Sequence, residues 1–208
     1  MINEFHIPSP YLLFTGNADS VQTDAKTAAG VADWSREKCL GQLWMKSTRV
    51  DLGLPHLSLE EAVKKGAKTL IVGVAPMGGR IENDWVDLFE KAIEAGLNIA
   101  AGLHTRLSSI DRLKSAANKY KKQLFDVRYY DGPIPPPSGK KRTGKRLLTV
   151  GTDCAVGKKY ATLAIAKKMK EKGLDATFRA TGQTGILIAG SGIAIDNLIC
   201  DDCFGGVE

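Results

Sequence analysis

The clearest chemistry in this sequence lies in a glycine-framed stretch, residues 147–159, which reads Leu-Leu-Thr-Val-Gly-Thr-Asp-Cys-Ala-Val-Gly-Lys-Lys. Gly151 would turn the chain off a strand, and Gly157 would let the backbone approach a ligand closely. Lys158 adds a cation at the start of a helix, whose unpaired N–H groups attract anions. The pattern predicts a phosphate-binding loop. The alternative interpretation is a glycine-rich turn capped by Asp153.

The loop departs from the common pattern at its end. That pattern has four residues between the glycines and a Ser or Thr after the lysine, whereas here five residues intervene and Lys159 replaces the hydroxyl. Losing a magnesium ligand and gaining a charge favours CoA, whose phosphates need donors and cations, over Mg-ATP. Thr152 and Thr162 remain as alternative hydroxyls. The predicted cofactor-binding residues are Gly151, Thr152, Asp153, Cys154, Ala155, Val156, Gly157, Lys158, Lys159 and Tyr160.

Alternating strands and helices must position this loop. Apolar runs predict strands at 11–15, 69–74, 97–101, 124–127, 146–150 and 176–180. Apolar spacing and helix-end signals predict helices at 24–34, 58–65, 85–93, 109–122 and 158–172. Ser58 and Glu61 have the spacing of a capping box. The alternation indicates an α/β fold with a parallel sheet, whose ligand sites lie at the carboxyl ends of the strands.

A segment rich in Pro, Gly and Lys, residues 131–146, divides the chain. We expect a Rossmann-like domain at 1–130 and the start of a P-loop α/β domain at 147–208. The latter has about 60 residues, near the lower limit for an independent core, and no predicted strand in it ends in an acidic residue to handle a metal. We therefore expect a truncated P-loop domain, with completion by another chain as the alternative.

Composition narrows the class of protein. The 208 residues are 43% hydrophobic, without an apolar run of about 20 residues or a signal-peptide pattern, so we expect a cytoplasmic protein. The net charge is +6, and the basic cluster in the linker lacks interleaved aromatic residues, so we expect no nucleic-acid partner. A single CxxC, Cys200–Cys203, and scattered histidines predict no metal site. The dinucleotide fingerprint is absent after the first strand, which argues against a dehydrogenase.

Three stretches resemble a known family. They are Gly151–Lys158, Ala180–Ile188 (ATGQTGILI) and Ala101–His104 (AGLH). The first is similar to the loop of dethiobiotin synthetases, and together they resemble the DgcN-like D-glutamate N-acetyltransferases. That resemblance implies a Rossmann-like domain followed by a P-loop domain, and transfer of acetyl from acetyl-CoA to the amine of D-glutamate. We expect a homo-oligomer with no membrane partner.

The chemistry of this transfer suggests roles for single residues. His104, at the end of a predicted strand, would act as the general base, although it could instead be a structural histidine. Asp153 is the alternative base, and Lys158 or the loop N–H groups would meet the oxyanion. Cys154 is an alternative nucleophile that would carry the acetyl group. The candidate residues for binding the dicarboxylate substrate are Arg80, Arg106, Arg179, Thr181, Gly182, Gln183 and Thr184.

Two other functions stay open. The first is an ATP-dependent ligase of the dethiobiotin-synthetase type, which would use ATP with magnesium. The second is a nucleotide- or CoA-binding module without turnover.

Overall fold

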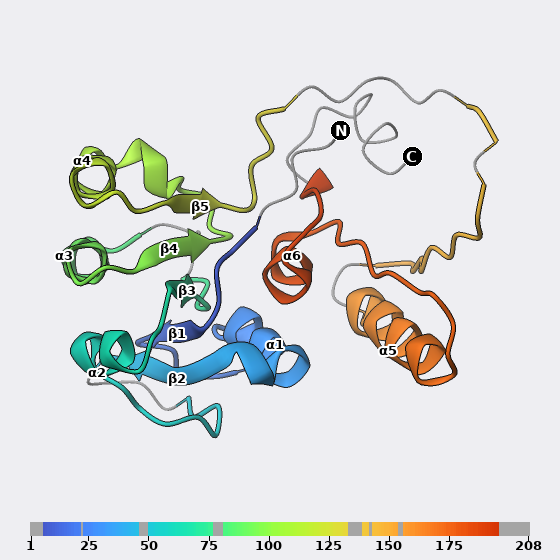
Figure 1. Cartoon of the computed structure of the whole chain (residues 1–208), viewed down its shortest axis with the longest axis horizontal. Coiled ribbons are helices and arrows are strands. Elements are labelled where there is room, and N and C mark those ends of the chain that lie inside the picture. The colour runs from blue at the N-terminus through green and yellow to red at the C-terminus, as the bar shows by residue number, and fades with distance from the viewer. Residues whose placement is uncertain are drawn as a thin grey trace.

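A parallel five-stranded sheet organises the protein (Figure 1). The computed structural model describes residues 6–21, 23–45, 50–76, 81–132, 139–141, 143–153 and 156–195. The strands lie in the order β2-β1-β3-β4-β5, and every pairing is parallel. Their bounds are Tyr11–Gly16 (β1), Cys39–Trp44 (β2), Thr69–Val72 (β3), Asn98–Ala101 (β4) and Leu124–Asp126 (β5). The α/β class and four of these strands confirm the sequence predictions.

Helices connect the strands and cover both faces of the sheet. They are α1 (Lys26–Trp34), α2 (Leu59–Lys64), α3 (Asn83–Glu94), α4 (Asp111–Tyr120), α5 (Lys158–Glu171) and α6 (Gln183–Ala189), with short 3₁₀ turns at Arg36–Lys38 (η1) and Leu107–Ser109 (η3). The five predicted helices are present, with bounds close to those expected, as is usual for helix ends.

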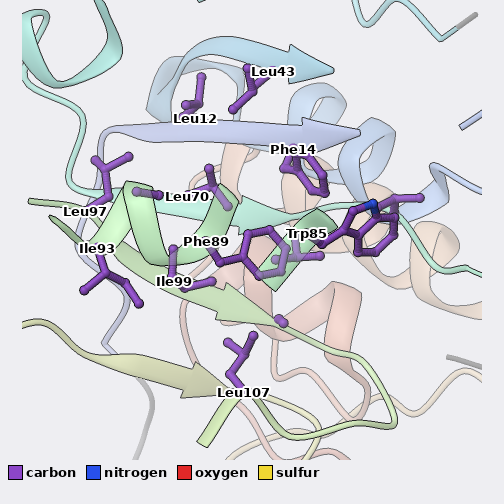
Figure 2. Close-up of a cluster of buried hydrophobic side chains, with 14 of the residues drawn as sticks. Leu12, Phe14, Leu43, Leu70, Trp85, Phe89, Ile93, Leu97, Ile99 and Leu107 are labelled. Atoms are coloured by element: carbon purple, nitrogen blue, oxygen red, sulfur yellow. The ribbon is translucent and has the colours of Figure 1, made fainter. Parts of the chain in front are cut away.

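The core lies on both sides of the sheet, because successive strand residues point to opposite faces. Phe14 on β1 packs edge-to-face against Trp85 and Phe89 of α3, with ring centroids 5.3 Å apart in each pair (Figure 2). Leu13 and Ile71 face the other way and pack in a second buried cluster. Burial on both faces explains why these strands are continuous apolar runs in the sequence.

Helix α6 completes the second face, although it lies far beyond β5 in the chain. It packs beside α1 (Figure 1), and Ile186, Leu187 and Ile188 are buried in the cluster that contains Leu13 and Ile71. Ser35 Oγ, just after α1, donates a hydrogen bond to the Ile188 carbonyl at 3.0 Å. A segment from the second half of the chain is therefore part of the core of the Rossmann-like sheet.

Two predicted strands are wrong. Residues 146–150 form no strand within the described part of the chain, and three of their apolar side chains are solvent-exposed: Leu147, Leu148 and Val150. Residues 176–180 contribute only an isolated bridge, from Ala180 to Gly192. Both predictions fail for the same physical reason. An extended segment becomes a strand only where a neighbouring strand satisfies its backbone N–H and C=O groups. The division into domains at 131–146 stays a prediction.

The predicted capping box at the start of α2 is confirmed. The Ser58 hydroxyl accepts from the Glu61 N–H at 3.2 Å, and the Glu61 carboxylate accepts from the Ser58 N–H at 2.8 Å. We expect Ser58→Ala to lower the free energy of unfolding by about 1 kcal/mol, because one helix N–H loses its partner. Urea unfolding followed by circular dichroism measures this change. Ser58→Asp, which can still cap the helix, should keep most of the stability, and an equal loss in both variants would contradict the prediction.

Candidate functional site

The site begins where the start of α6 meets the carboxyl end of β4. Gly102 follows β4 directly, and a Cβ built on it would lie 2.6 Å from both Cβ and Cγ of Gln183. Only a residue without a side chain allows this approach. Two of the stretches that stood out in the sequence, Ala101–His104 and Ala180–Ile188, are thus in direct contact.

The same segment shares a cavity of about 240 Å³ with the glycine-framed loop. Two lysines, Lys158 and Lys159, line it from the start of α5, and Arg179 lines it from the segment before α6. None of the lining residues in the described part of the chain is acidic, so the pocket is suited to an anion. The other lining residues are Leu147, Leu148, Thr149, Thr162, Phe178, Thr181, Gly182 and Gly185. We call this cavity the P-loop pocket.

The loop ends at a left-handed glycine, where α5 begins. Gly157 is the N-cap of α5 and has φ of +96°, a left-handed conformation that favours glycine. Lys158 starts the helix, and its ammonium donates to the Asp153 carbonyl within the loop. The Thr149 and Thr162 hydroxyls lie 2.5 Å apart, and both are within hydrogen-bonding distance of the Lys158 carbonyl. One hydroxyl therefore donates to the carbonyl, and the other donates to that hydroxyl. These hydroxyls hold the segment before the loop against the first turn of α5.

Lys159 is half-buried in the same pocket, and an aromatic pair supports it. Its Nζ lies 4.3 Å from the ring centroid of Tyr160. Tyr160 in turn stacks on Trp34 at the end of α1, with centroids 6.2 Å apart. Gly30 gives the Tyr160 hydroxyl room to approach α1. Burial lowers the pKa of Lys159 to about 8, because the charged ammonium loses hydration there.

We expect this pKa to make anion binding depend on pH. As the pH rises from 7 to 9, Lys159 loses its proton and the affinity for inorganic pyrophosphate should fall about tenfold, the effect of losing about 1.4 kcal/mol of charge-assisted binding. Above pH 8, binding should take up a proton, because the anion favours the ammonium. Calorimetric titrations in two buffers of different ionisation enthalpy measure both effects.

Lys159→Arg is the matched control, since a guanidinium stays charged throughout this range. Its pyrophosphate affinity should be nearly constant between pH 7 and 9, apart from the titration of pyrophosphate itself. A native affinity with the same pH dependence as Lys159→Arg would contradict the role of Lys159.

The remaining candidates in and beside the loop differ in position. Gly151, Thr152, Asp153 and Val156 are exposed, and Cys154 and Ala155 lie outside the described residues. Thr184 does not line the P-loop pocket, because its hydroxyl lies 3.0 Å from that of Thr27 on α1. Its observed contact is therefore structural, holding α6 against α1.

Arg106 and His104 lie in the connection after β4, and neither lines the P-loop pocket. Arg106 forms two hydrogen bonds to the Asp131 carboxylate, at 2.9 and 3.1 Å, which raise its pKa, and it stacks over the Tyr129 ring. His104 has an exposed side chain, and its carbonyl accepts from the Tyr129 hydroxyl. Arg80 lies outside the described residues.

Sequence reasoning missed part of the pocket. Thr149 and Phe178 line it from the two segments that were expected to be strands. Trp34 acts indirectly, through Tyr160. The Thr149 side chain carried a weak signal, a hydroxyl just before the first glycine, whereas nothing local to Trp34 indicates a contact with α5.

The described residues lack two further features. No group of three or more His, Cys, Asp or Glu side chains there is placed to hold a metal ion. The described helices include none with both the length and the apolar character that crossing a bilayer requires. Cys200 and Cys203 lie outside the described residues.

Comparison with known proteins agrees with this architecture. Residues 39–130 match the domain of unknown function DUF1611_N, a Rossmann-like domain, and residues 135–208 match DUF1611_C, a P-loop domain. Two curated relatives, from Pseudoalteromonas sp. and Tritonibacter scottomollicae, are named D-glutamate N-acetyltransferase. They are 46% and 44% identical over 97% of this chain, which spans 60% of the length of each.

A solved structure shares the fold. The crystal structure of a DUF1611 family protein from Anabaena variabilis ATCC 29413 superimposes with a TM-score of 0.81 at 29% sequence identity. The match covers 95% of this chain and 61% of that one.

Proposed function

Because the chain belongs to the DUF1611 family, whose Rossmann-like and P-loop domains both match it, we propose that it transfers an acetyl group from acetyl-CoA to the amine of D-glutamate. The names of the two curated relatives support the reaction. The observation that carries the proposal is the P-loop pocket, which Lys158, Lys159 and Arg179 line and whose described lining includes no acidic residue. CoA brings a pyrophosphate and a ribose phosphate, which such a pocket fits without a metal ion.

The protein's own groups supply what the reaction needs. The start of α5 and Lys158 bind phosphate oxygens, as helix N-termini do. The ammonium of D-glutamate must lose a proton before its nitrogen attacks the thioester carbonyl. As the C–N bond forms, the C–S bond breaks, the nitrogen loses its second proton, and the departing sulfur takes one proton to become the CoA thiol. We assign proton removal to His104, which lies two residues beyond the contact of Gly102 with Gln183.

Acetyl transfer is tested directly with the whole chain, acetyl-CoA and D-glutamate. A thiol-reactive dye reports free CoA, and mass spectrometry identifies N-acetyl-D-glutamate. We expect release of CoA that depends on D-glutamate and does not require magnesium. The enzyme from Pseudoalteromonas, assayed in parallel, is the positive control. If that enzyme turns over while this chain releases no CoA, the proposal fails for this chain.

The same assay separates the other two functions. Formation of ADP from ATP that depends on magnesium would indicate a ligase of the dethiobiotin-synthetase type. Calorimetric binding of CoA with no product from either donor would indicate a binding module. Each of these results would replace the acetyltransferase proposal.

A further inference from the structure

Lys159 stands where the common phosphate-binding loop has a hydroxyl, and its side chain lines the P-loop pocket together with Lys158. The two lysines have different surroundings. The Lys158 ammonium donates to the Asp153 carbonyl within the loop. Among the described residues, no hydrogen bond or ion pair involves the Lys159 amine, whose Nζ lies over the ring of Tyr160. The pocket therefore holds an amine that the fold leaves uncommitted.

The surroundings of Lys159 also make this amine reactive. The other charged groups in the described lining of the pocket, Lys158 and Arg179, are cations. Asp33 on α1 acts on the neighbouring Tyr160, whose pKa is raised by burial and by that charge. Burial lowers the pKa of Lys159 to about 8. At pH 8 about half of these amines are neutral, compared with roughly 0.4% at the usual pKa of lysine, and only the neutral amine attacks a carbonyl carbon.

The pocket also selects which acyl donor reaches this amine. Phosphate oxygens bind at the start of α5, and in an acyl phosphate a single oxygen joins the carbonyl carbon to the phosphorus. A donor held by its phosphate group therefore has its carbonyl carbon in the same cavity of about 240 Å³ as Lys159. The thioester of acetyl-CoA, in contrast, is separated from the pyrophosphate by the whole pantetheine arm.

We propose that Lys159 is an acylation site for small acyl phosphates, which the P-loop pocket holds by their phosphate group. The Lys159 nitrogen attacks the carbonyl carbon and forms a C–N bond, and the bond from that carbon to the bridging oxygen breaks. The departing phosphate keeps the electron pair and takes the amine proton, so it leaves as hydrogen phosphate. The acylated lysine is uncharged, and the pocket loses one of its cations. This modification needs only the anion pocket, whether or not acetyl-CoA is the donor to D-glutamate.

The first test compares lysines within one peptide. The whole protein is treated briefly at pH 8 with ¹³C-labelled acetyl phosphate and denatured, and its remaining amines are acetylated with unlabelled acetic anhydride. Trypsin then cuts only at arginine, and the peptide 147–179 carries every lysine of α5, including the exposed Lys167. Fragment ions give the ¹³C fraction at each position. Lys159 should be labelled about tenfold more than Lys167, because its larger neutral fraction outweighs the lower nucleophilicity of a weaker base.

A donor without a phosphate group separates recognition from basicity. p-Nitrophenyl acetate acylates amines according to their nucleophilicity and access, so its preference for Lys159 over Lys167 should be about fivefold smaller than that of acetyl phosphate. Lys158→Ala removes a phosphate-binding cation and should lower the acetyl phosphate preference toward the value for the ester. Inorganic pyrophosphate, which occupies the pocket, should protect Lys159. An equal preference with the two donors in the native protein overturns the inference.

The loss of charge gives a second readout. Treatment with acetyl phosphate should weaken pyrophosphate binding at pH 7 about tenfold, measured by calorimetry. Lys159→Arg is the matched control, because its guanidinium stays charged and is not acylated. Its pyrophosphate affinity should survive the same treatment, and an equal loss in the native protein and in Lys159→Arg would overturn the inference.

The proposed function is tested separately, by CoA release from the untreated protein. Preferential labelling of Lys159 without CoA release would leave the modification site standing and remove the acetyltransferase proposal. CoA release with Lys159 labelled no more than Lys167 would remove only the modification site.

Discussion

Replacing Lys158 with alanine should weaken CoA binding about 100-fold. The side chain lines the P-loop pocket, and its ammonium already lies within the loop, donating to the Asp153 carbonyl. Removing a cation that hydrogen-bonds a phosphate costs on the order of 3 kcal/mol, which corresponds to that factor. Calorimetric titration with CoA measures the loss, and acetyl transfer should fall at least in parallel.

The control for this variant is Lys167→Ala, which removes the same charge from an exposed position on the same helix. It should leave CoA affinity within about twofold of the native value, because an exposed charge at a distance is screened by salt. Equal losses in the two variants would mean that net charge, and not the loop, accounts for binding.

Gly102→Ala should have the second large effect, a fall in turnover of about 100-fold. The new methyl group would lie 2.6 Å from two Gln183 carbons, so the start of α6 must move. Overpacking of this kind costs about 1–3 kcal/mol of stability. Displacing groups of a site by about 1 Å can cost 100-fold in rate. Urea unfolding and CoA release measure the two effects.

A double-mutant cycle identifies the contact responsible. Gln183→Gly removes both carbons that the new methyl group would meet, although glycine near a helix start costs up to about 1 kcal/mol. In the Gly102→Ala background this second change should raise stability, whereas in the native background it should lower it. If the two changes are simply additive in the free energy of unfolding, Gln183 is not the residue that Gly102 accommodates.

The strands that could be predicted are those whose pattern follows from burial on both faces. β1 and β3 are apolar runs because helices cover each side. β2 was missed because Gln42 interrupts its apolar pattern, yet Gln42 is 1% exposed. Its amide nitrogen donates to Asp51 at 2.6 Å, and its amide oxygen accepts from the Leu52 N–H at 2.9 Å. A buried polar residue whose partners lie across a loop gives no local signal.

The candidate site also has parts that the sequence predicts and parts that it does not. The loop at 151–158 could be identified because its glycines, its lysine and the helix start are neighbours in sequence. The contact between Gly102 and Gln183 could not, since it depends on α6 packing against a sheet formed far earlier in the chain. Arg106 was a candidate for substrate binding because of its residue type. Only the fold shows that its guanidinium already donates two hydrogen bonds to the Asp131 carboxylate.

The packing of α6 against the sheet also determines what happens when a protease cuts the chain between its two halves. The exposed basic residues Lys140, Lys141, Lys145 and Arg146 are natural trypsin sites. After cleavage there, the buried apolar side chains of α6 should hold the two fragments together as a native-like complex. The fragment ending at residue 140, prepared alone, would expose Leu13 and Ile71 to water and should associate or aggregate. Gel filtration distinguishes these outcomes, and recovery of a one-to-one complex on mixing would show that the Rossmann-like half reaches its native state only with its distant helix in place.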